Sequence, residues 1–216
     1  GLVVQEGLAG GTLAGNVQVL VGIGLDLDPA ALAASKPSTA FAFVDQPGAA
    51  PAANLSLIGD PTIDQQRQSF MAGYLAALVS SDYKVAGLIP AGQPLSDVMA
   101  DAFVVGAEFF CGVCNPLYPP FENYPQWQSL SPENVSEGFQ PVVDAFVLKG
   151  VEVLYIQRDL ATSEMLTYLA EFNVKIVGDA TPNSVRNHWV GTVTADPGPA
   201  LIALWPDLLA GIGGVQ

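Results

Sequence analysis

The chain has few basic residues: Lys and Arg number 7 against 21 Asp and Glu, which gives a formal net charge of −14 over 216 residues. Nucleic-acid binding needs clustered Lys and Arg that neutralise phosphates, and the sequence contains no such cluster. An anionic membrane surface is disfavoured as a partner for the same reason. Because only 13% of the residues are charged, the acidity reflects scarce bases rather than dense acidic runs, and it indicates a well-solvated surface.

Long hydrophobic runs are also missing. The longest apolar stretches, such as residues 17–25 and 85–89, have the length of a strand and are interrupted by Gly or polar residues, whereas a membrane-spanning helix needs about 20 apolar residues. Half of the residues are hydrophobic, so the chain can bury a sizeable core in one large domain or two modest ones. The sequence begins at Gly1 without the charged and apolar segments of a signal peptide, so we expect any such peptide to have been removed or omitted.

Cysteine and histidine are scarce. The two cysteines form Cys111-Gly-Val-Cys114, and the single histidine is His188. Redox catalysis would place such a pair at a helix N-terminus, where the pKa of a thiol is lowered, but this pair lies at the end of an expected helix. We expect a structural disulfide or two free thiols, and a disulfide would fit an oxidising, extracytoplasmic location. No Cys and His cluster suggests a metal, no motif demands a cofactor, and no nucleophile–base pair suggests an enzyme.

The sequence does contain strand-sized apolar runs that alternate with helix-sized amphipathic segments, which is typical of an α/β protein with parallel sheets flanked by helices. We expect helices at residues 28–35, 65–80, 96–110, 139–149, 163–172 and 200–210. We expect strands at residues 17–24, 39–44, 54–58, 85–89, 116–118, 151–156, 174–177 and 190–194. The proline-rich stretch 119–132 predicts irregular structure.

This alternation starts afresh near Val85, so we expect two α/β units, one formed by residues 1–82 with 190–216 and the other by residues 83–189. Parallel crossovers are right-handed, so the carboxyl ends of the strands in each unit share one edge, and ligands of such folds bind beyond that edge. Residues that follow strands are therefore the candidates for binding: Asp26, Asp45, Asp60, Ala91 to Gln93, Gln157 to Asp159 (with Arg158 between them) and Asp179.

A series of segments carries a likeness to one known family: Val21-Gly-Ile-Gly24, Phe41-Ala-Phe-Val-Asp45, Gln68-Ser-Phe-Met-Ala-Gly-Tyr-Leu-Ala-Ala77, Lys84-Val-Ala-Gly87, Ala102-Phe-Val-Val-Gly-Ala107 and Ile176-Val-Gly-Asp179. In this order they resemble the basic membrane protein family, a branch of the type 1 periplasmic-binding-protein fold. The third segment is the most specific. The resemblance implies a two-lobed fold that is N-terminally short, because the strand–helix unit that normally precedes a segment like Gly7-Leu-Ala-Gly10 is absent.

The resemblance implies an extracytoplasmic solute-binding protein of an ABC-type importer. Such a protein would hold a polar small molecule, with a nucleoside-like one favoured, in a cleft between two lobes and pass it to a membrane permease. It would be periplasmic or at the cell surface, with a lipid anchor as one form of attachment. In relatives an aspartate after the late strand grips the sugar hydroxyls, and Asp179 matches that position; a carboxylate can accept two hydrogen bonds from a vicinal diol. The family's lysine after the return strand has no counterpart in residues 193–197.

The two aspartates and the arginine each have a plainer explanation. Asp179 and Asp45 would otherwise be turn residues exposed to solvent. Arg158 would bind a ligand carboxylate or phosphate, or would form a local ion pair with Asp159 or Glu164.

The remaining candidates have structural alternatives as well. Gln65 and Gln66 lie at a helix start, where they would offer amides to a ligand or where Asp64 would merely cap the helix. Trp127 would form an aromatic lid with Tyr124 over a sugar or a base, or the two would pin the proline-rich loop to the surface. We expect Trp189 and Trp205 to be packing residues.

A different function also fits the sequence. The absent first unit and the absent lysine are consistent with a ligand-sensing or interaction domain that keeps the fold without transport. An enzyme on the same scaffold lacks a nucleophile–base pair in this sequence.

Overall fold

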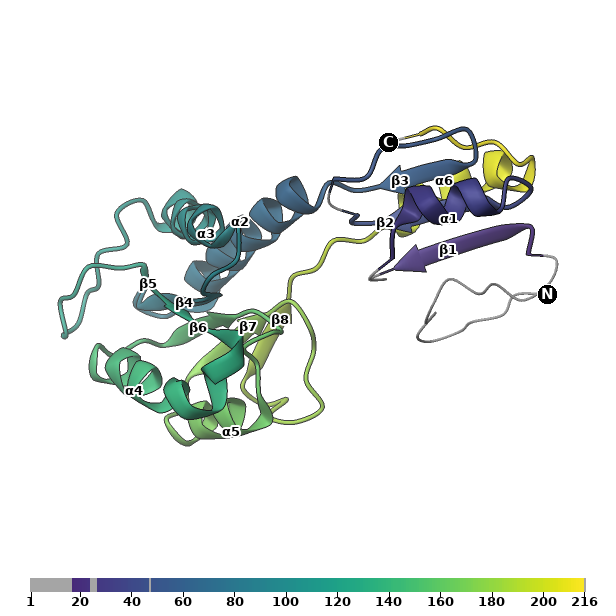
Figure 1. Ribbon diagram of the computed structural model, residues 1–216. Helices are drawn as coiled ribbons and strands as arrows, with labels where there is room; N and C mark the ends of the chain where they lie inside the picture. Colours follow the sequence, from purple (N-terminus) through teal and green to yellow (C-terminus); the bar gives the residue numbers. More distant parts are fainter. Residues whose placement is uncertain (1–16, 24–26, 47, 216) are drawn as a thin grey trace. The chain divides into compact units, whose positions relative to one another are not determined.

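Figure 1 shows the computed structural model of the chain, which describes residues 17–23, 27–46 and 48–215. These residues form an α/β fold with two separate sheets, each composed of parallel strands and flanked by helices. The chain divides into two compact units, unit 1 from residues 1–64 and 196–216 and unit 2 from residues 65–195. The expectations for Gly7–Gly10, Gly24 and Asp26 lie outside the described residues.

Unit 1 contains a sheet with the order β1-β2-β3, formed by β1 (Val19–Ile23), β2 (Ala40–Val44) and β3 (Leu55–Ile58). Helix α1 (Pro29–Ser35) buries Leu32 against Phe41 and Phe43 on one face of this sheet, while α6 (Gly198–Leu209) buries Leu208 against the other face. Asp28 caps α1, since its side chain accepts hydrogen bonds from the backbone of the first turn.

Unit 2 contains a sheet with the order β5-β4-β6-β7-β8, in which every neighbouring pair is parallel. Its strands are β4 (Val85–Pro90), β5 (Gln126–Leu130), β6 (Val153–Ile156), β7 (Lys175–Gly178) and β8 (Trp189–Thr192). The central strands β4 and β6 are buried along their whole length, as expected for strands that are covered by helices on both faces.

Two helices cover each face of this sheet (Figure 1). Helices α2 (Pro61–Val79) and α3 (Ser96–Cys111) lie on one face, where Phe103 of α3 packs against Gly87 of β4 and stacks on Tyr155 of β6. Helices α4 (Val135–Leu148) and α5 (Ser163–Glu171) lie on the other, and a short 3-10 helix, η2 (Pro132–Asn134), leads into α4. All of the predicted helices are present.

The unit boundaries differ from the predicted ones, because most of α2 belongs to unit 2 rather than to unit 1. The cause is a close contact between helix backbones. A Cβ atom placed on Gly73 of α2 would lie 2.0 Å from the carbonyl oxygen of Phe103, and one on Gly106 of α3 would lie 1.9 Å from that of Phe70. The small residues of α2 thus pack the helix against α3.

Two predictions in and beside the proline-rich stretch are wrong. Residues 116–118 form no strand, since the backbone N–H groups of Leu117 and Tyr118 donate to the carboxylate of Asp82 instead. The strand is β5, within the stretch predicted to be irregular. The prolines flank residues 126–130 without interrupting them, so these residues keep the N–H groups that a ladder with β4 requires.

The disulfide between Cys111 and Cys114 is present, which confirms one of the two expected states of the cysteines. It closes the turn that follows the last residue of α3. Within the described part of the chain, every helix falls short of the length and apolarity that a membrane crossing would need.

Candidate functional site

The most developed polar site lies at the carboxyl edge of the sheet in unit 2. Strands β6 and β7 are paired in parallel so that Ile156 faces Gly178, and Arg158 and Asp179 follow these two positions. The backbone N–H of Arg158 donates to Oδ1 of Asp179 at 2.6 Å, and its Nε donates to Oδ2 at 3.3 Å. Nη2 of Arg158 also donates to the carbonyl oxygen of Asp179 at 3.3 Å. The register of two strands therefore brings together two of the predicted site residues.

The two side chains differ in their exposure. The side chain of Asp179 is 13% exposed, whereas that of Arg158 is 59% exposed. Burial raises the pKa of Asp179, and the charge and hydrogen bonds of Arg158 oppose that rise. The site thus presents a largely buried carboxylate beside a cation that reaches solvent.

Behind this pair lie two buried hydroxyl groups that the sequence analysis missed. Tyr155 on β6 and Ser69 on α2 are both fully buried, and neither hydroxyl has a hydrogen-bond partner. Burial raises the pKa of Tyr155 to about 12. No signal in the sequence distinguishes Tyr155 from other aromatic residues of buried strands.

An aromatic side chain adjoins Asp179 from the next strand. The indole of Trp189 on β8 packs directly against Gly178, where an added Cβ atom would lie 2.3 Å from the ring. Its Nε1 donates to the hydroxyl of Thr192 at 2.9 Å, and that hydroxyl lies 2.6 Å from the hydroxyl of Thr181. The structure thus supports the expected packing role of Trp189 and also places this residue next to the candidate site.

The glutamines of the prediction lie at different places in unit 2. Gln93 is exposed and follows β4, whose carboxyl end lies beside that of β6. Gln157, directly before Arg158, donates from Nε2 to the sulfur of Met99 at 3.1 Å. Gln65 and Gln66 are half-buried near the start of α2, and Gln66 lines a groove between α2 and α3.

The start of α2 is capped by Asp60. The backbone N–H groups of Thr62 and Ile63 donate to Oδ1 of Asp60, at 2.9 Å and 3.3 Å. Asp64 reciprocates, since its Oδ2 accepts from the N–H of Asp60 at 3.0 Å. The expected capping by Asp64 is therefore one half of a capping box.

Trp127 is not grouped with Arg158 and Asp179. It lies in β5 at the edge of the sheet, opposite Gly87 of β4, and is 42% exposed. Tyr124 is buried and its hydroxyl donates to the carbonyl oxygen of Lys149, so this ring pins the loop before β5.

In unit 1, Asp45 follows β2 and has a positive φ of 52°. Burial raises the pKa of this residue, and the neighbouring charges of Asp64 and Asp60 raise it further. Among the described residues, no group of three or more His, Cys, Asp or Glu side chains is placed to hold a metal ion.

Comparison with known proteins places this geometry in a fold. No family model matches the chain, and no curated protein matches it by sequence. Among solved structures, an ABC transporter solute-binding protein from Conexibacter woesei aligns with a TM-score of 0.67 at 14% identity, over 90% of this chain and 62% of that protein. The chain thus spans less than two thirds of this relative's length.

Two further structures align over smaller shares. An ABC transporter solute-binding protein from Aeropyrum pernix has a TM-score of 0.55 at 14% identity, over 86% of this chain and 52% of that one. A transcriptional activator of the comK gene from Bacillus halodurans has a TM-score of 0.53 at 14% identity, over 75% of this chain and 52% of that one. The chain therefore has the type 1 periplasmic-binding-protein fold over part of its length.

Proposed function

We propose that the chain is a solute-binding protein of an ABC-type importer, related to the basic membrane protein family, and that it binds a polar small molecule without catalysis. The observation that carries the proposal is the pairing of Asp179 and Arg158 at the carboxyl edge of β6 and β7, where ligands of parallel α/β sheets bind. The likeness of the fold to ABC transporter solute-binding proteins supports it.

A nucleoside-like ligand is favoured by the chemistry of these residues. An ionised carboxylate offers about four lone-pair sites, so Asp179 can accept from a vicinal diol while it keeps its bonds to Arg158. The ring of Trp189, packed beside Asp179 against Gly178, supplies an aromatic surface on the same edge. Gln93 and Gln157 add amides, which can donate and accept.

Two further parts of the proposal concern location and partner. An extracytoplasmic location is supported by the disulfide between Cys111 and Cys114, because disulfides persist in oxidising compartments. A membrane permease is the partner that an importer requires. The location and the permease are properties of a complete importer. The chain spans 62% of the length of the solute-binding protein with which it aligns at a TM-score of 0.67, so both are part of the proposal.

Mass spectrometry of small molecules released from the purified chain tests the proposal, followed by thermal shifts with nucleosides, bases, sugars and amino acids. We expect one polar class to raise the melting temperature. The variant Asp179→Asn should lose most of that shift. The matched variant Glu171→Gln should keep it, since Glu171 ends α5 and α5 leads from the carboxyl end of β6 toward the amino end of β7. The absence of any stabilising metabolite, or equal shifts for both variants, would contradict the proposal.

A ligand-sensing domain is the second candidate. The observation that favours it is that Arg158 and Asp179 satisfy each other, as expected for a site that has exchanged its ligand for an internal ion pair. A transcriptional activator shares the fold. If the site has lost its ligand in this way, the purified chain should release no small molecule, and no metabolite class should change the melting temperature of the native chain or of Asp179→Asn.

A further inference from the structure

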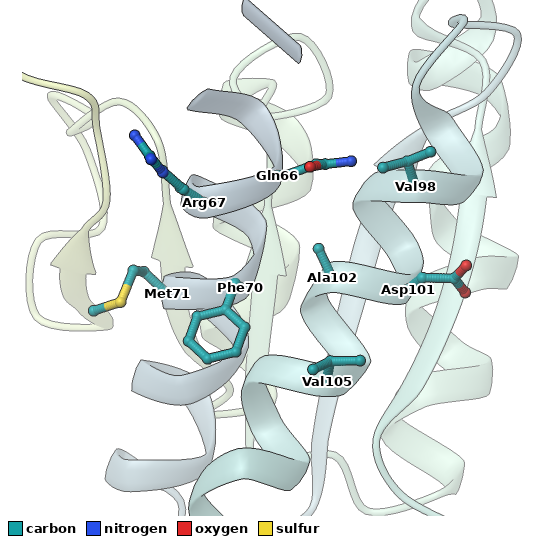
Figure 2. A pocket seen from close by; sticks show the side chains of 8 residues that line it. All are labelled: Gln66, Arg67, Phe70, Met71, Val98, Asp101, Ala102 and Val105. Atoms are coloured by element: carbon teal, nitrogen blue, oxygen red, sulfur yellow. The ribbon is translucent and has the colours of Figure 1, made fainter. Parts of the chain in front are cut away.

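An apolar groove runs between α2 and α3 on the outer face of unit 2, along the amino-terminal parts of both helices. Its volume is about 640 Å³, and it is lined by Gln66, Arg67, Phe70, Met71, Val98, Asp101, Ala102 and Val105. Figure 2 shows the apolar side chains along its floor and sides, with Arg67 and Asp101 projecting from opposite rims. The groove exists because Gly73 and Gly106 let the helix backbones touch. The larger side chains of the two helices lie beside this contact and line the groove.

The groove continues into an exposed aromatic ridge. Phe109 of α3 packs against Phe70 and Tyr74 of α2, with ring centroids 5.7 Å and 6.2 Å apart, yet it remains 74% exposed. Val105 and Met71 are 54% and 47% exposed. Two adjacent helices thus expose a continuous apolar surface to solvent, and exposed apolar surfaces of this kind mark interaction sites.

The charges on the two rims decide which partner fits. Arg67 lies one helical turn before Phe70, and Phe70 touches Gly106, so Arg67 is nearly level with Asp101 across the groove. A two-fold axis parallel to the groove would leave each residue of the second copy at the same position along the groove. It would also place the Asp101 rim of one copy opposite the Arg67 rim of the other. Each Arg67 would then face Asp101 of a second copy, and the Phe109 rings of the two copies would meet near the axis. An isologous interface requires such self-complementarity.

We propose that the α2–α3 face is a homodimer interface, in which two copies pack their grooves together and the Arg67 and Asp101 rims pair across the two-fold axis. The helices are about 28 Å and 24 Å long at 1.5 Å per residue, which gives a four-helix contact of ordinary proportions. The net charge of −14 on each copy opposes association at low salt, so the dimer should strengthen as ionic strength rises. This proposal is independent of the proposed transport function.

Sedimentation velocity and light scattering on the purified chain test the proposal. We expect a species of twice the 22.5 kDa chain mass at tens of micromolar. Val105→Lys and Phe109→Lys should each weaken the dimer by at least about 30-fold, the effect of losing a hot-spot residue at the centre of an interface. Leu148→Lys is the matched control, since Leu148 is 84% exposed at the end of α4, on the opposite face, and this variant should dimerise normally. Circular dichroism establishes that each variant is folded.

A charge reversal tests the two-fold arrangement. Asp101→Arg should weaken the dimer by about tenfold through like-charge contact, and the addition of Arg67→Asp should restore it. A native chain that stays monomeric at high salt, or folded groove variants that still dimerise, would overturn the proposal. A double reversal that associates no better than Asp101→Arg would overturn the arrangement of the rims.

Discussion

The backbone N–H of Arg158 and the carboxylate of Asp179 lie 2.6 Å apart across the carboxyl ends of β6 and β7. A main-chain donor is thus dedicated to the same carboxylate that the Arg158 side chain contacts through Nε. The main-chain bond depends on strand register, whereas the side-chain bond depends on a guanidinium that is largely exposed. The first can persist while the second is exchanged for a ligand.

Removing the guanidinium should raise the pKa of Asp179 further. Burial already raises this pKa, and Arg158 is what opposes the rise. In Arg158→Gln the carboxyl group should therefore titrate at a higher pH than in the native chain. Carbon-13 NMR titration of the Asp179 carboxyl measures this, with Arg186→Gln as the control, because Arg186 does not contribute to the pKa of Asp179. An unchanged or lower pKa would contradict the assigned role of Arg158.

The raised pKa of Asp179 determines the direction in which the stability of the fold changes with pH. Between the unfolded and folded pKa values the folded state binds more protons than the unfolded state. The contribution of Asp179 is therefore fully present below the ordinary aspartate pKa of 3.8 and is lost as pH rises through the folded pKa. In urea unfolding across this pH range, Asp179→Asn should lose less unfolding free energy with rising pH than the native chain, since the amide does not titrate.

Most of the fold could be predicted from periodicity. The central strands β4 and β6 are continuous apolar runs, and Gly150 precedes β6 while Gly178 ends β7. Strand β5 could not be predicted, because Gln126–Leu130 alternates half-buried and exposed residues at a sheet edge and lies among prolines. The placement of α2 in unit 2 depends on a tertiary contact between Gly73 and α3 that small residues permit but do not specify.

For the candidate site, the sequence could predict only the edge of the sheet at which it lies. Strand order places Arg158 and Asp179 together, and the rule for parallel sheets anticipates this. The hydrogen bonds between them depend on register, which sequence patterns leave open. Trp189 enters the site because its ring rests on Gly178, and the unpartnered hydroxyls of Tyr155 and Ser69 depend on side-chain orientation.

Removing Asp82 should destabilise unit 2 strongly. Its carboxylate lies 2.8 Å from Nζ of Lys84, both side chains are less than a tenth exposed, and it accepts from the N–H groups of Leu117 and Tyr118. In Asp82→Ala the buried ammonium group of Lys84 loses its counter-ion and keeps only its bond to the carbonyl oxygen of Pro119. The two backbone N–H groups also lose their acceptor, so we expect a loss of about 3–5 kcal/mol of unfolding free energy. Urea denaturation measures it.

Lys84→Met in the Asp82→Ala background supplies the control, because it removes the stranded cation and should recover part of the loss. Burial alone would raise the pKa of Asp82, but the bonds from Lys84, Leu117 and Tyr118 outweigh it and the pKa is lowered. The stabilisation should therefore be present above the ordinary aspartate pKa of 3.8 and lost as pH falls through the folded pKa. A double variant less stable than Asp82→Ala would refute this account.

Loss of the disulfide should have a modest effect. Cys111 and Cys114 are separated by three positions, and closing so short a loop restricts the unfolded chain by only about 2 kcal/mol. The double variant Cys111→Ser with Cys114→Ser should fold and unfold at a slightly lower urea concentration. Native chain treated with reductant should match it, and a failure of the reduced chain to fold would show that the bond contributes more than loop closure.

The contact between α2 and α3 should be intolerant of a single methyl group. In Gly73→Ala the new Cβ atom would lie 2.0 Å from the carbonyl oxygen of Phe103, so the helices must separate and the packing of Phe103 on Tyr155 must loosen. Overpacking of this kind costs about 1–3 kcal/mol, and backbone leaves little room for relief, so we expect the upper end. Differential scanning calorimetry should record a lower melting temperature.

Gly138→Ala is the matched substitution within a helix. There the added Cβ atom meets only Cδ1 of Leu130, at 3.0 Å, and this end of a side chain can move aside. Since alanine favours a helix interior by about 1 kcal/mol over glycine, Gly138→Ala should be neutral or stabilising in α4. If Gly73→Ala were equally harmless, the helices would not be held at backbone contact, and the groove beside Phe70 would have a different origin.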